Sequence, residues 1–145
     1  MSDYTHILMA VDFTESAEQI LAKALDIAEH NNAKLSMLHV VEYMPPVDYA
    51  NDPMVSNWVA DDEMLEQAKK SLQKFSKQHS LKNVDLHVQF GKPKHVISQF
   101  VKDQQCDLVI LGSHGRHGIS LLLGSTASAV LHAMPCDILT LKIEK

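Results

Sequence analysis

Short apolar runs alternate with longer amphipathic segments along the whole chain. Apolar runs of this length are typical of strands that are covered on both faces of a sheet. The predicted strands are His6–Val11, Lys34–Val41, Val84–Phe90, Asp107–Leu111 and Asp137–Ile143. Hydrophobic and polar positions alternate strictly only in Val84–Phe90, which favours a place near the edge of the sheet for this strand.

The amphipathic segments between these runs predict four helices. The first begins at Thr14 or Ser16, either of which can cap it, and ends at Asn31–Asn32. The others run from Asp61 to about His79–Ser80, over Lys94–Gln104 and over Ser125–Ala133. Strands alternating with helices indicate an α/β fold with a doubly wound (Rossmann-like) parallel sheet and helices on both faces. We expect one domain, residues 1–145, and the pattern alone leaves the strand order open.

Composition narrows the classes of function. The 145 residues are 46% hydrophobic and 21% charged, as in a globular domain. Thirteen basic and eighteen acidic residues give a net charge of −5, which argues against a nucleic-acid partner but allows a local anion site. No apolar run approaches the roughly 20 residues of a membrane helix, and the first residues lack the basic region of a signal peptide. We therefore expect a cytoplasmic protein without membrane contacts.

The loop after the fourth predicted strand carries the most specific signal. Gly112, Gly115 and Gly118 lie within seven residues, and Gly124 follows directly before Ser125-Thr126 at a predicted helix start. Glycines let backbone amides approach an anion, a helix start adds free amides, and Arg116 can add a charged hydrogen bond. The alternative is a tight turn followed by an ordinary Ser/Thr cap. The spacing matches neither a Walker A loop nor a dinucleotide fingerprint.

Asp12 follows the first predicted strand directly. Ligands of open α/β sheets bind beyond the carboxyl ends of the strands, so its carboxylate is a candidate to accept from a ribose hydroxyl or to hold Mg²⁺. The alternative is a carboxylate that stabilises the start of the following helix. The residues themselves leave both interpretations open.

Several segments together resemble the universal stress protein A family over essentially the whole chain. They are AVDFTES after the first strand, LHVVE at the second, GKP (Gly91–Pro93) after the third, and LGSHGRHG, LLGSTASAVL and PCDILTLK towards the end. The resemblance implies a single universal stress protein domain with five parallel strands in the order 3-2-1-4-5. It also implies a function in the stress response.

Some members of this family bind ATP, and they carry the pattern G-x2-G-x9-G-[ST]. By this resemblance, adenine and ribose lie against Ala10, Val11, Asp12 and Val40, and ribose and phosphates against Leu111, Gly112, Gly115, Gly124, Ser125 and Thr126. Only eight residues separate Gly115 from Gly124, one fewer than in the pattern. We expect ATP, with Mg²⁺ held at Asp12 if it accompanies the nucleotide, and at most slow hydrolysis because no general base can be identified. No catalytic residue and no resident metal is assigned.

The resemblance also makes the last strand, Asp137–Ile143, an edge that is too apolar to stay exposed, so we expect a homodimer through it. The alternative function is a nucleotide-independent universal stress protein that acts through protein–protein contacts. An adenine-nucleotide α-hydrolase is disfavoured because SGGxDS is absent after the first strand. A flavodoxin-like FMN protein has the same alternation of elements and is a minor alternative.

Three further features have ordinary interpretations. His39, His114 and His117 favour hydrogen-bonding roles over a metal site, because no cluster of carboxylates or thiolates accompanies them. Cys106 and Cys136 form no CxxC motif and are interpreted as reduced thiols, with a redox pair as the alternative. The long insertion Glu42–Ala60 is expected to pack on the following helix, with a lid or docking role as the alternative.

Overall fold

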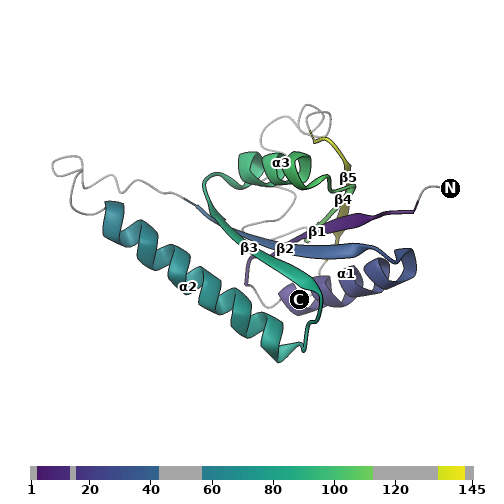
Figure 1. Cartoon of the computed structure of the whole chain (residues 1–145), viewed down its shortest axis with the longest axis horizontal. Helices are drawn as coiled ribbons and strands as arrows, with labels where there is room; N and C mark the ends of the chain where they lie inside the picture. The colour runs from purple at the N-terminus through teal and green to yellow at the C-terminus, as the bar shows by residue number, and fades with distance from the viewer. Residues whose placement is uncertain (1–2, 14–15, 43–56, 113–133, 143–145) are drawn as a thin grey trace.

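The chain forms a five-stranded parallel sheet flanked by helices (Figure 1). The computed structural model describes residues 3–13, 16–42, 57–112 and 134–142. The strands are β1 His6–Ala10, β2 Lys34–Val41, β3 Val84–Phe90, β4 Leu108–Gly112 and β5 Asp137–Leu141, and the helices in these ranges are α1 Ala17–Asn31, α2 Asn57–Gln78 and α3 Pro93–Gln104. The sheet has the order β3-β2-β1-β4-β5, which confirms the fold class, the strand order and the edge position of β3.

The helices cover the sheet on two faces (Figure 1). On one face, α1 and α2 bury Ile20, Leu21, Ala24 and Leu72 against the sheet. On the other, α3 buries Ile97, Phe100 and Val101. The central strand β1 is buried along its whole length because it contributes side chains to both layers, and this explains its continuous apolar run.

The ends of α1 were predicted in part. Asn32 adopts the left-handed conformation, with φ of 52°, and its amide donates to the carbonyl of Glu29, so the helix ends where the sequence predicted. Ser16 is the N-cap residue, but its side chain makes no capping hydrogen bond because its backbone is helical rather than extended. Thr14, the other predicted cap, lies outside the described residues.

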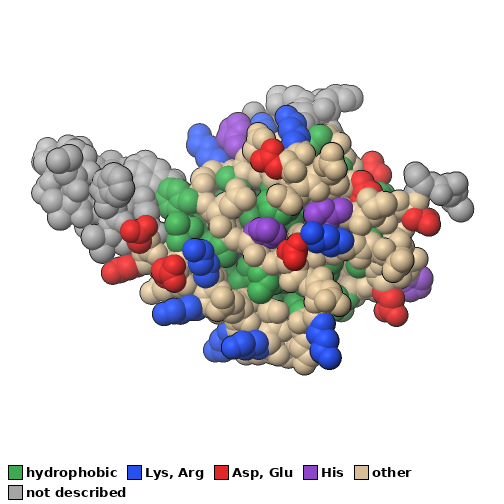
Figure 2. Space-filling model, viewed as in Figure 1, with side chains coloured by type: hydrophobic (Ala, Val, Ile, Leu, Met, Phe, Trp, Pro, Cys, Tyr) green, Lys and Arg blue, Asp and Glu red, His purple; other side chains and the backbone are tan. Residues whose placement is uncertain are grey.

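Helix α2 begins at Asn57, so the predicted start at Asp61 is wrong. The residues from Asn57 to Ala60 include no proline or glycine. The nearest helix-breaking residue before them in the sequence is Pro53. Acidic side chains gather near the start of α2 and basic ones further along it (Figure 2), at Asp62, Glu63, Glu66, Lys69, Lys70, Lys74 and Lys77. The first turn itself holds no acidic residue, whereas Lys77 lies in the last turn, where a positive charge complements the helix dipole. The end of the insertion before α2 is therefore helical, and residues 43–56 lie outside the described part.

Three strands and one helix differ from the predicted bounds by a residue or two. β1 ends at Ala10, β5 ends at Leu141, and α3 already begins at Pro93, where proline suits a first helical turn. β4 begins at Leu108 because Asp107 turns its side chain back to β1. Ile143 and the predicted helix Ser125–Ala133 lie outside the described residues.

Gly91 explains the tight connection from β3 to α3. Its φ is +147°, and a Cβ at this position would come within 2.9 Å of Cγ2 of Val96. Glycine is therefore required both for the backbone conformation and for the close approach of α3. Within the ranges that the structure describes, no helix is both long and apolar enough to cross a membrane.

Candidate functional site

The centre of the sheet has the topology of a ligand-binding edge. β1 and β4 are neighbours, and the chain leaves β1 towards β2 on one side and β4 towards β5 on the other. The connection from β1 uses α1 on one face of the sheet, whereas α3, which leads into β4, lies on the opposite face (Figure 1). The carboxyl ends of β1 and β4 therefore form the switch point at which open α/β sheets bind ligands.

Several residues predicted to line a nucleotide meet at this carboxyl edge. Ala10 is the last residue of β1, Val40 and Leu111 are the last but one of β2 and β4, and the three are 3%, 2% and 0% exposed. Their side chains belong to the core layer beneath α3, so they form an apolar floor rather than an open wall. Val11 is 1% exposed and extends β1 by one bond, because its amide donates to the Leu38 carbonyl at 2.9 Å.

Asp12 lies in the connection between β1 and α1, two residues after the end of β1, and is half-buried. The next residue, Phe13, has φ of 58°, a conformation that is rare for an aromatic residue. A carboxylate at this place is a suitable acceptor for a hydroxyl and a suitable oxygen ligand for Mg²⁺. The structure therefore brings the adenine and ribose half of the predicted site together.

His39 connects the end of β2 to this loop. Its Nδ1 lies 2.6 Å from the Val11 carbonyl oxygen, and its ring packs on Phe13 with 4.4 Å between the ring centroids. The hydrogen-bonding role predicted for this histidine is thus confirmed, although it acts from a strand. Its link to Val11 was missed, because only the pairing of β1 with β2 brings residues 28 apart in sequence into contact.

A shallow pocket of about 220 Å³ opens beside His39 on the α2 face. It is lined by Phe13, His39, Val40, Val41, Glu42, Met64, Gln67, Ala68 and Ser71. Pockets that enclose whole drug-sized ligands are usually larger than about 300 Å³. This pocket can hold part of a ligand at the carboxyl edge, and a complete nucleotide needs further contacts.

Most residues predicted to bind the phosphates lie outside the part of the chain that the structure describes. Gly112 ends β4 at the switch point, where its Cα is the register partner of Leu141. Gly115, Arg116, Gly124, Ser125 and Thr126 lie outside the described residues, and so do His114 and His117. In the ranges that are described, no three His, Cys, Asp or Glu side chains group as ligands for a metal ion.

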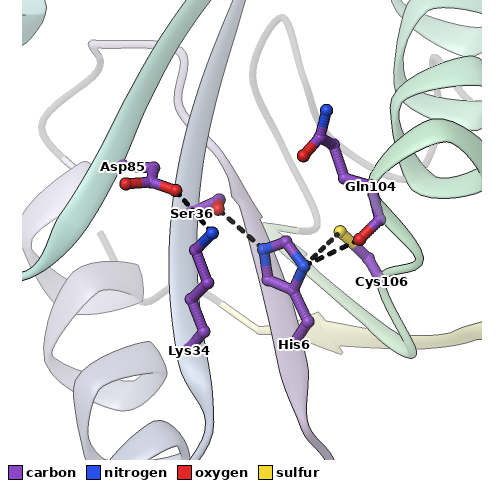
Figure 3. Close-up of polar contacts among 6 residues, drawn as sticks. All are labelled: His6, Lys34, Ser36, Asp85, Gln104 and Cys106. Atoms are coloured by element: carbon purple, nitrogen blue, oxygen red, sulfur yellow. Dashed lines mark hydrogen bonds and ion pairs between the residues drawn. The ribbon is translucent and has the colours of Figure 1, made fainter.

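A second polar cluster lies at the opposite, amino edge of the sheet (Figure 3). His6 is 9% exposed, with Nε2 2.7 Å from the Ser36 hydroxyl and Nδ1 3.0 Å from the Gln104 carbonyl oxygen. Since a carbonyl oxygen only accepts, Nδ1 carries the hydrogen and donates to it. The Ser–His contact has the geometry of a nucleophile with its base, but Ser36 is 1% exposed and no substrate can reach it. This cluster is therefore structural.

Asp107 ties the same edge together. Its carboxylate accepts hydrogen bonds from the Thr5 amide, the Thr5 hydroxyl and the His6 amide at 2.8, 3.0 and 3.0 Å. Burial opposes the charged form, but these hydrogen bonds outweigh it and hold the pKa of Asp107 below its usual range. The carboxylate thereby joins the start of β1 to the start of β4.

The two cysteines lie near this edge and are both free thiols. Cys106 is buried, and Cys136 packs against the same core layer. Burial, with the negative charge of Asp107, raises the pKa of Cys106 to about 11. Burial and the neighbouring Cys106 raise the pKa of Cys136 to about 12. Both thiols therefore stay protonated near neutral pH, as expected of reduced structural cysteines.

Comparisons with known proteins agree with this fold. The chain matches the universal stress protein family over residues 3–142. It is 34% identical over 145 residues to universal stress protein A homolog 2 of Coxiella burnetii, covering 99% of each chain. The solved structure of UspA from Lactobacillus plantarum is 31% identical, with a TM-score of 0.66 over 97% of this chain and 99% of that chain.

A third protein with a similar fold was solved with a bound ligand. A universal stress protein solved in complex with cAMP has a TM-score of 0.58 over 97% of this chain and 98% of that chain. At 23% identity, this likeness concerns the fold alone. The family model matches nearly the whole sequence, and the strand order 3-2-1-4-5 is the order that the resemblance of the sequence motifs implied. The chain belongs to the universal stress protein family.

Proposed function

We propose that this protein is an adenine-nucleotide-binding module of the stress response, with ATP as a ligand that is hydrolysed slowly if at all. The observation that supports it best is the place of Asp12 and Gly112 at the ends of two adjacent central strands. The glycine-rich sequence that follows Gly112 would supply the phosphate contacts through Gly115, Arg116, Gly124, Ser125 and Thr126. The relative solved in complex with cAMP supports an adenine nucleotide as the class of ligand.

Calorimetric titration of the nucleotide-stripped protein with ATP, with and without Mg²⁺, tests this proposal. We expect saturable binding near one ATP per chain. Asp12→Ala should weaken it about tenfold, the effect of one lost hydrogen bond of ordinary strength. Asp85→Asn, a charge removal at the start of β3 on the opposite edge, is the control and should leave it unchanged. No heat and no thermal shift at millimolar ATP would exclude the proposed ATP binding.

A second candidate function is a nucleotide-independent member of the same family that acts through protein contacts. One observation favours it: only eight residues separate Gly115 from Gly124, one fewer than in the pattern of the ATP-binding members. Gly115→Val distinguishes the two functions. It should abolish ATP binding in a folded chain if the loop holds phosphate, whereas a nucleotide-independent protein would show no ATP binding even before the change.

We further propose that two copies pair through the edge strand β5. Its hydrophobic residues Ile138, Leu139 and Leu141 are only half-buried, and β4 is its hydrogen-bonded neighbour on one side. Pairing with the same strand of a second copy would cover them under two-fold symmetry. Sedimentation velocity should give twice the chain mass of 16.2 kDa. Leu141→Lys, checked for folding by circular dichroism, should shift the protein to monomer, and a monomeric wild type would refute the pairing.

A further inference from the structure

The connection between β1 and α1 holds an unfavourable backbone conformation. Phe13 has φ of 58°, in the left-handed region that side chains with a Cβ disfavour. A bulky residue persists there only where its surroundings determine the conformation more strongly than its own preference. The contacts that impose this conformation are therefore part of how the loop presents Asp12.

His39 supplies two such contacts. Its Nδ1 lies 2.6 Å from the carbonyl oxygen of Val11, and this oxygen requires that Nδ1 carry the hydrogen. The imidazole ring also packs against Phe13, with centroids 4.4 Å apart and ring planes inclined by 42°. A single side chain at the end of β2 thus contacts the residue before Asp12 and the residue after it.

The backbone of Val11 is held at both of its polar groups. The amide donates to the Leu38 carbonyl at 2.9 Å, and the carbonyl accepts from the ring of His39. Two consecutive residues of β2, Leu38 and His39, therefore hold the backbone of the residue directly before Asp12. The rigid part of this arrangement is the sheet itself, because Leu38 is 0% exposed and lies in the core.

We propose that His39 is a positioning residue of the nucleotide site, which holds Val11 and Phe13 so that Asp12 faces the ribose of a bound nucleotide. The part that concerns ribose rests on the proposed function, whereas the control of the loop by His39 does not. His39 acts through the loop, and its ring lines the same shallow pocket as Phe13.

Three variants separate the hydrogen bond from the bulk of the ring. In His39→Asn, the side-chain amide nitrogen takes the place of Nδ1 and can still donate to Val11. In His39→Gln, the amide reaches the place of Nε2 instead, and His39→Ala removes both functions. Calorimetry with ATP should show His39→Asn within about threefold of the wild type, and His39→Gln and His39→Ala about tenfold weaker, the effect of one lost hydrogen bond. Equal affinity for all three variants would overturn the proposal.

Nuclear magnetic resonance of the nucleotide-free protein tests the same idea without a ligand. Nitrogen-15 spectra of the wild type should show hydrogen on Nδ1 of His39, and the amides of Asp12 and Phe13 should shift in His39→Ala but keep their positions in His39→Asn. A ring with hydrogen on Nε2 alone would refute the role of His39, even if no variant folds. Absence of ATP binding by the wild type would instead refute the nucleotide function, and the spectra would still decide whether His39 holds the loop.

Discussion

Two histidines at opposite ends of the same sheet make the same kind of hydrogen bond for different purposes. At the amino edge, Nδ1 of His6 donates to the Gln104 carbonyl, and at the carboxyl edge, Nδ1 of His39 donates to the Val11 carbonyl. His6 is 9% exposed and its second nitrogen bonds to the buried Ser36, whereas His39 is only partly buried and lines a pocket.

The two histidines differ in the polar groups that lose a hydrogen-bond partner when the side chain is removed. Loss of His6 would leave the buried Ser36 hydroxyl without its histidine partner, which is costly because water cannot replace that partner. Loss of His39 would remove one part-buried hydrogen bond, to the Val11 carbonyl, made by a side chain that is only half-buried and lines a pocket. The amino edge therefore serves stability, and the carboxyl edge is free to serve binding.

The largest effect that we expect from this contrast is slow alkylation of the two thiols near the amino edge. At pH 7.5, raising the pKa of Cys106 from 9.0 to about 11 should slow its alkylation by iodoacetamide about a hundredfold. With a pKa raised to about 12, Cys136 should react about a thousandfold more slowly than an ordinary thiol. Mass spectrometry of native and urea-unfolded protein measures both rates. Equal rates in the two states would contradict the closed character of this edge.

Alanine at the two histidines compares the edges directly. His6→Ala should lower the free energy of unfolding by about 3 kcal/mol, because it removes a buried ring and leaves the buried Ser36 hydroxyl without its histidine partner. His39→Ala should cost about 1 kcal/mol, the value of one hydrogen bond near solvent. Urea denaturation followed by circular dichroism gives both values. A larger loss for His39→Ala would reverse the assignment of stability to the amino edge.

Acidification should weaken the tie at Asp107. The pKa of this carboxyl is lower in the folded chain than its ordinary value of 3.8, so its contribution is complete above that value and is lost as the pH falls through the lower, folded pKa. Asp107→Asn should cost about 1 kcal/mol at pH 7, since the amide oxygen still accepts. It should also flatten the loss of stability below about pH 4. Urea unfolding at several pH values checks this, and parallel profiles for both proteins would contradict it.

The smallest effect is expected for the ion pair of Lys34 with Asp85. Nζ lies 2.7 Å from Oδ2, and this lowers the pKa of Asp85 through a hydrogen bond (Figure 3). Both side chains are about half exposed, so solvent screens the pair. Lys34→Met should therefore change the free energy of unfolding by less than about 0.5 kcal/mol. A loss above 1 kcal/mol would show that the amino-edge cluster extends to these surface charges.

The predicted bounds of the elements are correct where residues close together in the sequence decide the structure. Lys34–Val41 and Val84–Phe90 have the predicted bounds, because their pattern already contains the faces that they bury. The start of β4 was missed because Asp107 bonds to Thr5 and His6, about a hundred residues away. The start of α2 was missed because an absence of helix breakers is a weaker signal than a cap.

The sequence by itself determined the class of fold, the alternation of its elements and the motifs of the family, since these depend on hydrophobic period and local residue order. It also predicted that Asp12 and Gly112 follow adjacent strands at one edge of the sheet, because parallel strands end at a common edge. Only the tertiary structure decided which histidine is buried at one edge and which one holds the loop at the other. The physical reason is that His6 with Ser36, and His39 with Val11, meet through the pairing of β1 with β2, and such long-range contacts leave no periodic trace in the sequence.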